Sequence, residues 1–395
     1  MTATQPRSLL QALHCSQCGQ EQSAFIRQTL SACCRMPLLS RYDLAPDRFR
    51  PADLLARPAT MWRYWEVLPV LDPQHQVSLG EGFTPLLTLD RLASLTGLER
   101  VTLKDEGLNP TGSFKARGLS MAISKAKENG EQACIIPTAG NAGVAMAAYC
   151  ARAGLEAVVV MPRHTPDSFK DECRFYNARL IEVDGLINDC AAEVQTLNRD
   201  GRYFDVSTLK EPYRLEGKKT MGYEIAEQLN WQLPDVILYP TGGGTGLVGI
   251  WKAFREMQAL GWLAPNQALP RLVAVQSDQC CPVVATYRGL QPNSKHYEGR
   301  PTLANGLAVP RPIGEPLILA ALRESKGTAL AVSENALLAG TRALARHEGL
   351  FVAPEGGALW AALLQLKEQG WIQPHEHVLL LNTGSGQKYM DNLTV

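Results

Sequence analysis

The sequence predicts an α/β protein with two domains, each a parallel-rich twisted sheet covered by helices, after a degenerate zinc-ribbon-like N-terminal extension. Three observations support this prediction. Short apolar runs alternate with helical patterns from Arg100 onward, glycine-rich turns follow three of these runs, and a cysteine-rich segment opens the chain. Continuous apolar strands separated by helices are typical of parallel sheets buried on both faces, which bind ligands at the carboxyl ends of their strands.

Length and composition limit the function classes. A chain of 395 residues can form two or three domains, and 45% apolar with 20% charged residues is typical of a soluble enzyme. The net charge is zero without charged blocks, which argues against nucleic acid or an anionic membrane as partner. Residues 1–13 lack the apolar core of a signal peptide, no run could span a bilayer, and ten scattered cysteines suit a reducing compartment. We therefore expect a cytoplasmic protein.

The N-terminal extension contains two cysteine pairs. Cys15 and Cys18 form a Cys-x-x-Cys knuckle, and the adjacent Cys33 and Cys34 follow after a short gap. Two pairs usually indicate a zinc ribbon, in which four soft ligands surround a tetrahedral ion. Two neighbouring thiolates rarely both reach one metal, however, and the position three before Cys34 is Ser31. The candidate ligands are therefore Cys15, Cys18 and Cys34, and bound zinc and a metal-free remnant of a ribbon remain alternatives.

The rest of the chain is assigned from its apolar pattern. A stretch rich in Pro, Arg and Trp, residues 42–76, is interpreted as a connecting arm. Strands are predicted at residues 101–104, 134–137, 157–161, 180–183, 236–239, 272–275 and 377–381. Helices are predicted at residues 116–127, 142–153, 167–176, 188–198 and 247–257, with another after the strand at 272–275.

Lys115 is the main candidate for a catalytic residue. It ends the segment 109–115, Asn-Pro-Thr-Gly-Ser-Phe-Lys, between a predicted strand and a predicted helix. Ser113 is a good N-cap residue, so Lys115 is expected in the first helical turn, where the helix dipole disfavours an ammonium. Such a lysine keeps more of the free amine that Schiff-base chemistry requires. Phe114 offers a flat apolar wall for a planar ring. The alternative is a solvated lysine at a helix start.

The first glycine-rich turn, residues 138–143, links a strand to an Ala-rich helix. Its backbone amides and the hydroxyl of Thr138 are suited to hold a carboxylate at a helix N-terminus. The side-chain amide of Asn141 is suited to donate to a ring hydroxyl. An ordinary turn with an Asn N-cap explains the same residues equally well.

The second glycine-rich turn, residues 241–246, directly follows the strand at 236–239. Its glycine amides open onto a helix and are suited to cradle a phosphate. Residues 244–249 also satisfy the G-x-G-x-x-G dinucleotide fingerprint, with Asp278 after the next strand. A nicotinamide enzyme, however, would leave the segment around Lys115 unexplained.

Two more segments carry candidate ligand groups. Thr383 follows the last strand, and its hydroxyl is suited to bond a heterocyclic nitrogen, which would leave that nitrogen largely unprotonated; an ordinary glycine-rich turn is the alternative. Residues 211–220 bring Arg214 and two lysines to a helix start, either as an anion clamp or as a solvated basic helix start. This segment lacks the upstream glycine of a P-loop, which argues against ATP.

Together these segments resemble the pyridoxal-phosphate enzymes of the tryptophan-synthase-β fold type, or fold type II, and the threonine synthases most closely. The resemblance runs from about Ser78 to Tyr389 and rests on residues 80–86, 104–107, 109–115, 140–143, 213–217 and 382–384. The Cys15/Cys18 ribbon also looks like the N-terminal extension of many threonine synthases. The resemblance implies a lyase of threonine biosynthesis that converts O-phospho-L-homoserine and water to L-threonine and phosphate.

The resemblance also implies roles for residues. Lys115 forms the Schiff base with pyridoxal phosphate and shuttles protons, Phe114 lines the ring, and Asn141 bonds the ring hydroxyl. Thr383 partners the pyridine nitrogen, and Arg214 takes the substrate phosphate. The cofactor phosphate is held by Gly242, Gly243, Gly244, Thr245 and Gly246. The substrate carboxylate is taken by Thr138, Ala139, Gly140 and Asn141.

By the same resemblance, the chain divides into an extension with its arm (1–77), a large cofactor-binding domain (78–118 and 207–395) and a small mobile domain (119–206). Relatives of this fold type are usually dimers, so a homodimer is expected. The expected partner is a small phosphorylated amino acid, without nucleic acid or membrane.

Departures from the family pattern leave the substrate open. Residues 242–244 are all glycine where many threonine synthases carry Asn, which looks more like the dehydratases of this fold. Thr138 and Ala139 replace the usual Ser-Ser or Ser-Thr, and the ribbon lacks one cysteine. The alternatives are a threonine or serine dehydratase or a cysteate-synthase-like enzyme. An NAD(P) oxidoreductase and a non-catalytic metal-binding module are more distant alternatives.

Overall fold

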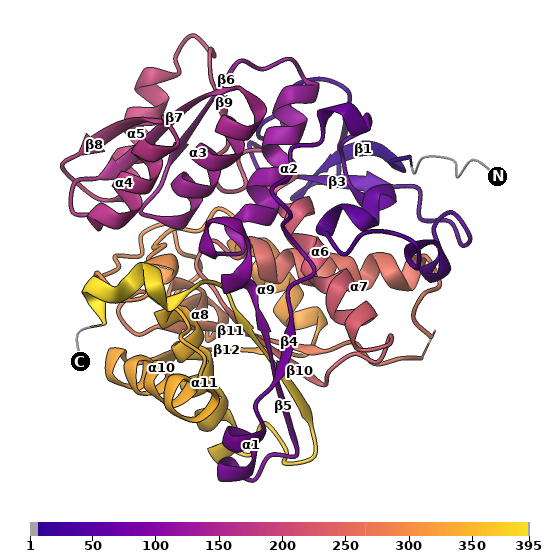
Figure 1. Ribbon diagram of the computed structural model, residues 1–395, viewed down its shortest axis with the longest axis vertical. Coiled ribbons are helices and arrows are strands. Elements are labelled where there is room, and N and C mark those ends of the chain that lie inside the picture. Colours follow the sequence, from indigo (N-terminus) through magenta and orange to yellow (C-terminus); the bar gives the residue numbers. More distant parts are fainter. Residues whose placement is uncertain (1–6, 265, 394–395) are drawn as a thin grey trace. The chain divides into compact units, whose positions relative to one another are not determined.

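A computed structural model describes residues 7–264 and 266–393 of the chain (Figure 1). These residues form two compact units. Unit 1 comprises residues 7–83, 115–224 and 252–264, and unit 2 comprises residues 84–114, 225–251 and 266–393. The predicted division into domains, which includes a small mobile domain at 119–206, stays a prediction.

Unit 1 begins with a small antiparallel sheet in the order β2-β1-β3. Its strands are β1 (Leu10–Cys15), β2 (Glu21–Gln22) and β3 (Leu38–Tyr42). The core under this sheet consists of a few apolar side chains: Leu10, Leu13, Ala24, Leu38 and Tyr42. The extension is therefore a thin β-ribbon whose own core is small.

The predicted connecting arm packs into unit 1 instead of bridging loosely. It contains η1 (Pro51–Leu54), η2 (Met61–Val67) and η3 (Pro73–His75), and all seven residues of η2 are buried. Its aromatic residues explain this, because the ring centroids of Trp62 and Trp65 lie 5.2 Å apart and bury a large apolar area.

A four-stranded sheet in the order β8-β7-β6-β9 forms the second part of unit 1, and all its pairs are parallel. Its strands are β6 (Ala133–Pro137), β7 (Glu156–Pro162), β8 (Arg179–Val183) and β9 (Phe204–Asp205). The helices of this part are α2 (Lys115–Glu128), α3 (Asn141–Ala153), α4 (Asp167–Phe175), α5 (Ile187–Leu197) and the start of α6 (Tyr213–Gln228). The predicted strands and helices of this region are confirmed to within two residues.

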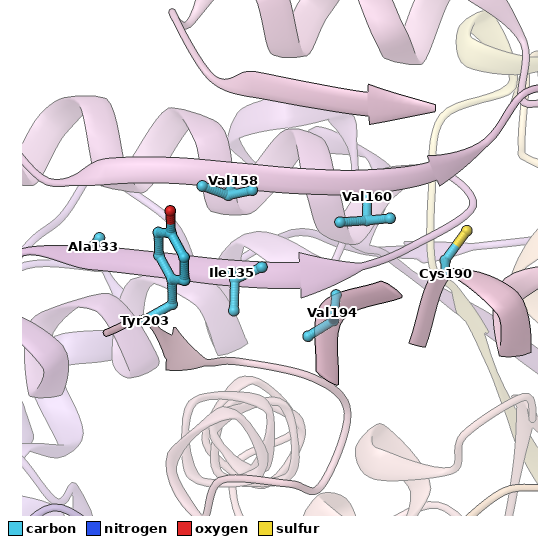
Figure 2. Close-up of a cluster of buried hydrophobic side chains, with 7 residues drawn as sticks. All are labelled: Ala133, Ile135, Val158, Val160, Cys190, Val194 and Tyr203. Atoms are coloured by element: carbon cyan, nitrogen blue, oxygen red, sulfur yellow. The ribbon is translucent and has the colours of Figure 1, made fainter. Parts of the chain in front are cut away.

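Alternating residues of β6 and β7 face opposite sides of this sheet. Figure 2 shows one side, where side chains of both strands gather with Cys190 and Val194 of α5. The residues between them face α3, since a Cβ placed on Gly143 of that helix would meet Val159 Cγ1 at 2.8 Å. Burial on both faces explains why these strands are continuous apolar runs in the sequence.

Unit 2 contains a six-stranded sheet in the order β12-β11-β10-β13-β5-β4. Its strands are β4 (Leu86–Thr88), β5 (Arg100–Asp105), β10 (Val236–Pro240), β11 (Arg271–Ser277), β12 (Thr328–Val332) and β13 (His377–Asn382). All pairs are parallel except β4 with β5, so an antiparallel edge strand completes the sheet. The last strand, β13, therefore lies in the middle of the sheet.

Unit 2 contains the start of α7 (Thr245–Ala259) and α8 (Pro282–Tyr287), which correspond to predicted helices. It also contains four helices without a predicted counterpart: α1 (Asp90–Thr96), α9 (Glu315–Glu324), α10 (Glu334–Glu348) and α11 (Pro354–Glu368). Short 3-10 turns are η4 (Glu106–Leu108), η5 (Pro110–Gly112), η6 (Asn305–Leu307) and η7 (Gly386–Asn392). Helix α11 packs on the central strands and α10 lies beside it (Figure 1). Within the described ranges, no helix is long and apolar enough to cross a membrane.

Candidate active site

In unit 2, the segment before the lysine is held against the end of the central strand. Phe114 N–H donates to the Thr383 carbonyl at 3.1 Å, and Ser385 N–H donates to the Gly112 carbonyl at 2.9 Å. Ser113 and Gly384 form an antiparallel bridge between these two bonds. The pairing fixes the backbone of Phe114 beside Thr383, and Lys115 is the next residue in the chain.

The turn before this segment is shaped by β5 and its acidic end. The Glu106 carboxylate is buried and accepts bonds from Thr84 Oγ1 at 2.6 Å and Asn109 Nδ2 at 2.8 Å. Thr111 and Gly112 then take positive φ angles of 61° and 65°. The reversal turns the chain back toward the carboxyl end of β13, where parallel sheets place their ligands.

The glycine-rich turn after β10 needs its glycines. A Cβ on Gly242 would lie 2.2 Å from the Gly306 carbonyl oxygen, one on Gly244 would lie 2.2 Å from Ile318 Cδ1, and one on Gly246 would meet Tyr239 Oη at 1.9 Å. The turn therefore packs against its surroundings without side chains of its own. Because α7 starts at Thr245, the first amides of that helix have no acceptor within it and point into the turn, as in phosphate-binding turns.

Within unit 2, aromatic packing brings Phe114 close to the glycine-rich turn at 242–246. The ring of Phe114 meets that of Tyr239, at the end of β10, edge-on with centroids 6.2 Å apart. Unit 2 thus gathers the turn at 242–246, Phe114 and Thr383, three of the elements predicted to hold the cofactor.

Ser113 does not cap α2 as predicted. Lys115 is the first residue of that helix, so its predicted place in the first turn is confirmed. The Ser113 hydroxyl, however, is buried and has no hydrogen-bond partner among the described residues. Burying a hydroxyl without a hydrogen-bond partner costs free energy, unless a bound ligand supplies the partner. Together with the α7 N-terminus and the buried Thr383, it is a donor set that fits the phosphate and ring of pyridoxal phosphate.

In unit 1, a buried ion pair fixes the helix that starts at Lys115. Arg117 donates to both oxygens of Glu224 on α6, at 2.5 and 2.7 Å, and to Thr220 Oγ1 at 3.0 Å. Both side chains of the pair are fully buried. A bidentate pair allows one geometry, so α2 is held in register with α6 two residues after the lysine.

Two glycines let these helices approach closely. A Cβ on Gly217 of α6 would lie 2.1 Å from the Arg117 carbonyl oxygen, and one on Gly118 of α2 would lie 2.9 Å from the Arg214 carbonyl oxygen and from Lys218 Cε. The crossing therefore excludes any larger residue at either position. It brings the first turns of both helices, with their cationic side chains, into one region of unit 1.

Glu81 is a second buried anchor for α2. Its carboxylate accepts bonds from Trp62 Nε1 at 2.8 Å, Ser120 Oγ at 2.6 Å and Tyr149 Oη at 2.6 Å. These partners come from η2, α2 and α3, so one carboxylate ties three elements of unit 1 together. This explains why the segment at 80–86 is glycine-rich around a single acid: it forms a tight turn around a buried hub.

The turn at 138–140 is closed by its own residues. The Thr138 hydroxyl accepts from Gly140 N–H at 3.2 Å, and Gly140 takes φ 156°. Asn141 opens α3, so the amides of that helix start face the turn. A helix N-terminus of this kind is suited to bind an anion, and Ala139 has only backbone groups to offer; the carboxylate predicted here stays a prediction.

Arg214 and Lys218 lie one helical turn apart on α6, and both are about 1% exposed. Arg214 donates from Nη1 to the Val206 carbonyl at 2.6 Å, while its Nε is buried with no partner in the described residues. Desolvation lowers the pKa of Lys218 well below its usual value, and Arg214 and Lys115 lower it further by repulsion. The alternative of a solvated basic helix start is therefore wrong.

Glu211 is a buried acid that interacts with both Arg214 and Lys218. It accepts from Tyr213 N–H at 2.7 Å and Arg214 N–H at 3.1 Å, which caps α6. Burial raises its pKa to about 7, against the lowering effect of Arg214. A buried carboxyl that stays partly protonated near neutral pH is the kind of perturbed group that gathers at ligand-binding sites.

The third basic residue of this segment does not belong to the clamp. Lys219 pairs with Glu216 at 2.5 Å and Glu256 at 2.9 Å, and Lys252 pairs with Glu256 at 3.3 Å and with Glu216. Tyr42 Oη of β3 also donates to Glu216 at 2.9 Å. Two lysines and two glutamates balance here, so this face of α6 is structural.

The residues that shape the site differ in how clearly the sequence marks them. Lys218 is one of the two lysines in the predicted anion clamp, and its spacing of four from Arg214 places it on the same helix face. Arg117 and Glu81 carry no motif that distinguishes a buried anchor from a surface charge. Cys33 was left out of the metal set because it adjoins Cys34, yet its Sγ lies 3.4 Å from that of Cys18.

Comparisons with known proteins identify the family of the chain. The family model of the pyridoxal-phosphate dependent enzymes matches residues 77–384. The chain is 34% identical to the threonine synthase of Methanocaldococcus jannaschii, over 90% of the chain and 87% of the relative. It is 37% identical to the threonine synthase of Synechocystis, over 84% and 85%.

Solved structures show the same fold at lower identity. Diaminopropionate ammonia lyase from Escherichia coli superposes with a TM-score of 0.68 at 20% identity, over 81% of the chain and 89% of that structure. Maize serine racemase gives a TM-score of 0.66 at 20% identity, over 77% and 88%. These are fold type II neighbours, as expected. The match over residues 77–384 and the identity to curated relatives over most of both chains show that this protein belongs to the threonine synthase family of pyridoxal-phosphate-dependent enzymes.

Proposed function

We propose that the protein is a threonine synthase that converts O-phospho-L-homoserine and water to L-threonine and phosphate. The observation that carries the proposal is the buried pair of cations, Arg214 and Lys218, in the same unit as Lys115. A phosphate monoester carries negative charge and acceptor oxygens, which suit it to an arginine and a lysine that are buried one helical turn apart. The relatives named threonine synthase support the same assignment.

The residues suited to the cofactor follow from unit 2 and the first turn of α2. The amides at 242–246 hold its phosphate, Phe114 lines the ring, Thr383 bonds the ring nitrogen, and Lys115 attaches it covalently. Asn141 is assigned to the ring hydroxyl. When bound, pyridoxal phosphate supplies an electron sink for the carbon acids of the substrate. A hydroxyl partner such as Thr383 leaves the ring nitrogen without a formal charge, which moderates that sink.

Lys115 Nζ is the group assigned to proton transfer. Its position at the positive end of α2 disfavours the ammonium, so the amine is available to take a proton from substrate carbon and return it. Arg117, held by Glu224, keeps that helix start in place and has no contact with substrate in this assignment. The lysine therefore moves the proton, and the ion pair positions the lysine.

Substrate binding is divided between two helix starts of unit 1. The amides of the turn at 138–140 and of α3 bind the carboxylate, and Arg214 with Lys218 binds the phosphate. Burial has already desolvated both side chains, so the substrate phosphate can form strong charge-assisted hydrogen bonds with them. The reaction needs water only at the β-carbon, after phosphate leaves, and binding both ends of the substrate orients that carbon.

The test is a product assay with purified protein loaded with pyridoxal phosphate. O-phospho-L-homoserine is added, and phosphate, L-threonine and 2-oxobutyrate are measured together. We expect phosphate and threonine in equal amounts. The Lys115→Ala variant is expected to release neither and to lose the absorbance band of the covalently bound cofactor. Turnover that releases no phosphate contradicts the proposal. So does a wild-type protein that keeps its absorbance band but forms no threonine.

A dehydratase is the second candidate, and the all-glycine turn at 242–244 is the observation that favours it. That turn offers no side chain to a substrate phosphate. The same protein is therefore incubated with L-threonine and L-serine. Formation of 2-oxobutyrate or pyruvate at a higher kcat/KM than threonine formation from O-phosphohomoserine assigns the enzyme as a dehydratase, and the reverse order assigns it as a synthase.

We further propose that the enzyme acts as a cytoplasmic homodimer on this small-molecule substrate. The ten cysteines are all free thiols in the structure, which suits a reducing compartment. Light scattering on the purified protein tests the dimer: a mass of twice 43.2 kDa is expected, and a mass of one chain contradicts it.

A further inference from the structure

The four cysteines of the N-terminal extension converge on one point. Cys15 ends β1, Cys18 lies in the turn after it, and Cys33 and Cys34 precede β3. Their Sγ atoms all lie within 4.8 Å of one another, with Cys18 and Cys33 at 3.4 Å. In a tetrahedral zinc site with Zn–S bonds of about 2.3 Å, the sulfurs are about 3.8 Å apart. The thiols are therefore gathered at the spacing that one zinc ion requires.

The two turns that carry the cysteines explain how adjacent residues reach one centre. In the first, Gly19 takes φ 75° and its N–H donates to the Cys15 carbonyl at 2.9 Å, while Gln17 N–H points at Cys15 Sγ at 3.4 Å. In the second, Arg35 takes φ 56° and its N–H donates to the Ser31 carbonyl at 3.0 Å. The tight second turn folds both neighbouring thiols toward the first, contrary to the expectation from their adjacency.

The small core of the extension gives a second, independent argument. The sheet is covered by five buried apolar residues, and β2 is only two residues long. Modules with cores of this size are usually stabilised by a metal or by disulfides, since the apolar area buried does not offset the loss of chain entropy. The long loop between Cys18 and Cys33 has no regular structure besides β2. A metal bound at both ends of that loop supplies the missing constraint.

The loop makes a specific contact that depends on its shape. Arg27 donates to the carbonyls of Gly201 at 3.0 Å and Tyr203 at 2.5 Å, and pairs with Glu131 at 3.2 Å. Its guanidinium also lies 5.7 Å from the ring centre of Phe204 in β9. One side chain thus joins the loop to the edge of the four-stranded sheet within unit 1.

We propose that Cys15, Cys18, Cys33 and Cys34 bind one Zn²⁺ as a structural site that holds the loop carrying Arg27 against the β9 edge. Zinc suits four thiolates in a tetrahedron, and each thiol gives its proton to solvent on binding. The site is closed by four protein ligands, so it has no open position for catalysis. Its function is to stabilise the extension, independently of which substrate the enzyme uses.

The first measurement is metal content of the full-length protein, purified under reducing conditions without chelator. Elemental mass spectrometry is expected to find one zinc ion per chain. Exchange with Co²⁺ is expected to give the absorption of a tetrahedral cobalt–thiolate centre. Iron in place of zinc, no metal after reconstitution with reductant, or a Cys18–Cys33 disulfide in the reduced preparation overturns the proposal.

Variants assign the ligands. Cys33→Ser is expected to lower zinc content at least several-fold, and Cys281→Ser, a half-buried thiol far along the chain, is the matched control and keeps one zinc. If Cys33→Ser fails to fold, wild type is titrated with a chelator. Hydrogen exchange is then expected to rise at least several-fold in residues 19–32 and 201–204. Unchanged exchange there, with zinc removed, contradicts the proposed structural role.

Discussion

Two faces of α6 use the same residue types for different purposes. On one face, Lys219 and Lys252 balance Glu216 and Glu256, and Tyr42 and Tyr223 donate to the two acids. On the other face, Arg214 and Lys218 are buried, and Arg214 interacts with both Asp205 and Glu211. Burial raises the pKa of the Glu211 carboxyl to about 7. Removing one partner of a buried, balanced charge cluster is strongly destabilising. Buried groups with strongly shifted pKa values, in contrast, gather at functional sites.

The comparison also shows why neighbours in sequence differ in function. Lys218 and Lys219 are adjacent and both are almost completely buried. Successive helical residues point about 100° apart, so Lys219 faces Lys252 and Glu256, and Lys218 faces the start of α2. Four substitutions, whose expected effects decrease in turn, test this distinction.

Lys219→Met breaks the balanced face. It leaves Glu216 and Glu256 with Lys252 alone, so we expect a loss of about 3–5 kcal/mol in the free energy of unfolding. Urea denaturation of the cofactor-loaded protein measures it. KM for O-phosphohomoserine is expected to stay within a factor of two in the folded variant. A large rise in KM with unchanged stability would place Lys219 in the substrate site.

Glu211→Gln tests the acid of the unbalanced face. The folded pKa of about 7 exceeds the usual value of 4.5, so this carboxyl stabilises the fold fully below pH 4.5 and loses that contribution as the pH rises through 7. The loss is on the order of 3 kcal/mol. We expect the unfolding free energy of wild type to fall between pH 5 and 8 more steeply than that of Glu211→Gln. If the unfolding free energies of wild type and of Glu211→Gln change in parallel with pH, Glu211 does not cause the pH dependence.

Lys218→Met is the matched partner of Lys219→Met. It removes an ammonium whose burial costs desolvation free energy, so a smaller loss of stability is expected than for Lys219→Met. A single lost charge-assisted bond to phosphate is worth about 1.5–3 kcal/mol, so kcat/KM for O-phosphohomoserine should fall about 10- to 100-fold, through KM. Steady-state kinetics measure it, with Arg214→Ala as the second variant of the same face. Equal loss with an unphosphorylated substrate would exclude a phosphate contact.

Ser113→Ala extends the same reasoning to one buried atom. The hydroxyl has no partner in the described residues, so its removal should raise the stability of the cofactor-free protein by up to about 1 kcal/mol. The same change should weaken pyridoxal phosphate binding several-fold, which fluorescence titration measures. Lower stability without a change in cofactor affinity would mean that the hydroxyl serves the fold alone.

Local patterns in the sequence were sufficient for the parts that depend on neighbouring residues. The apolar runs of β6, β7 and β10 are buried on both faces, and this produces their continuous pattern. Lys115 was expected at a helix start and α2 begins there, although Ser113 does not cap it. The residues at 242–246 were expected to form a turn without side chains, and the close contacts of Gly242, Gly244 and Gly246 require it.

Other features depend on residues far apart in the chain. Strand β13 is the last strand in the sequence and pairs with β10 and β5 in the centre of the sheet, because strand order follows non-local pairing. From the sequence, Cys33 and Cys34 are adjacent residues of which only one was expected to bind a metal. The turn closed by Arg35 brings the sulfur atoms of both close to those of Cys15 and Cys18.

The α/β class, the lysine at the helix start and the glycine-rich turns are each encoded by residues within a few positions of one another. Which charged groups lie together, in contrast, depends on the tertiary fold. Lys219 pairs with Glu256 of α7, whereas Lys218 lies against the start of α2, and both helices are distant from α6 in sequence. A buried charge is stabilised or left in need of a ligand by everything packed around it, and the tertiary fold sets that environment.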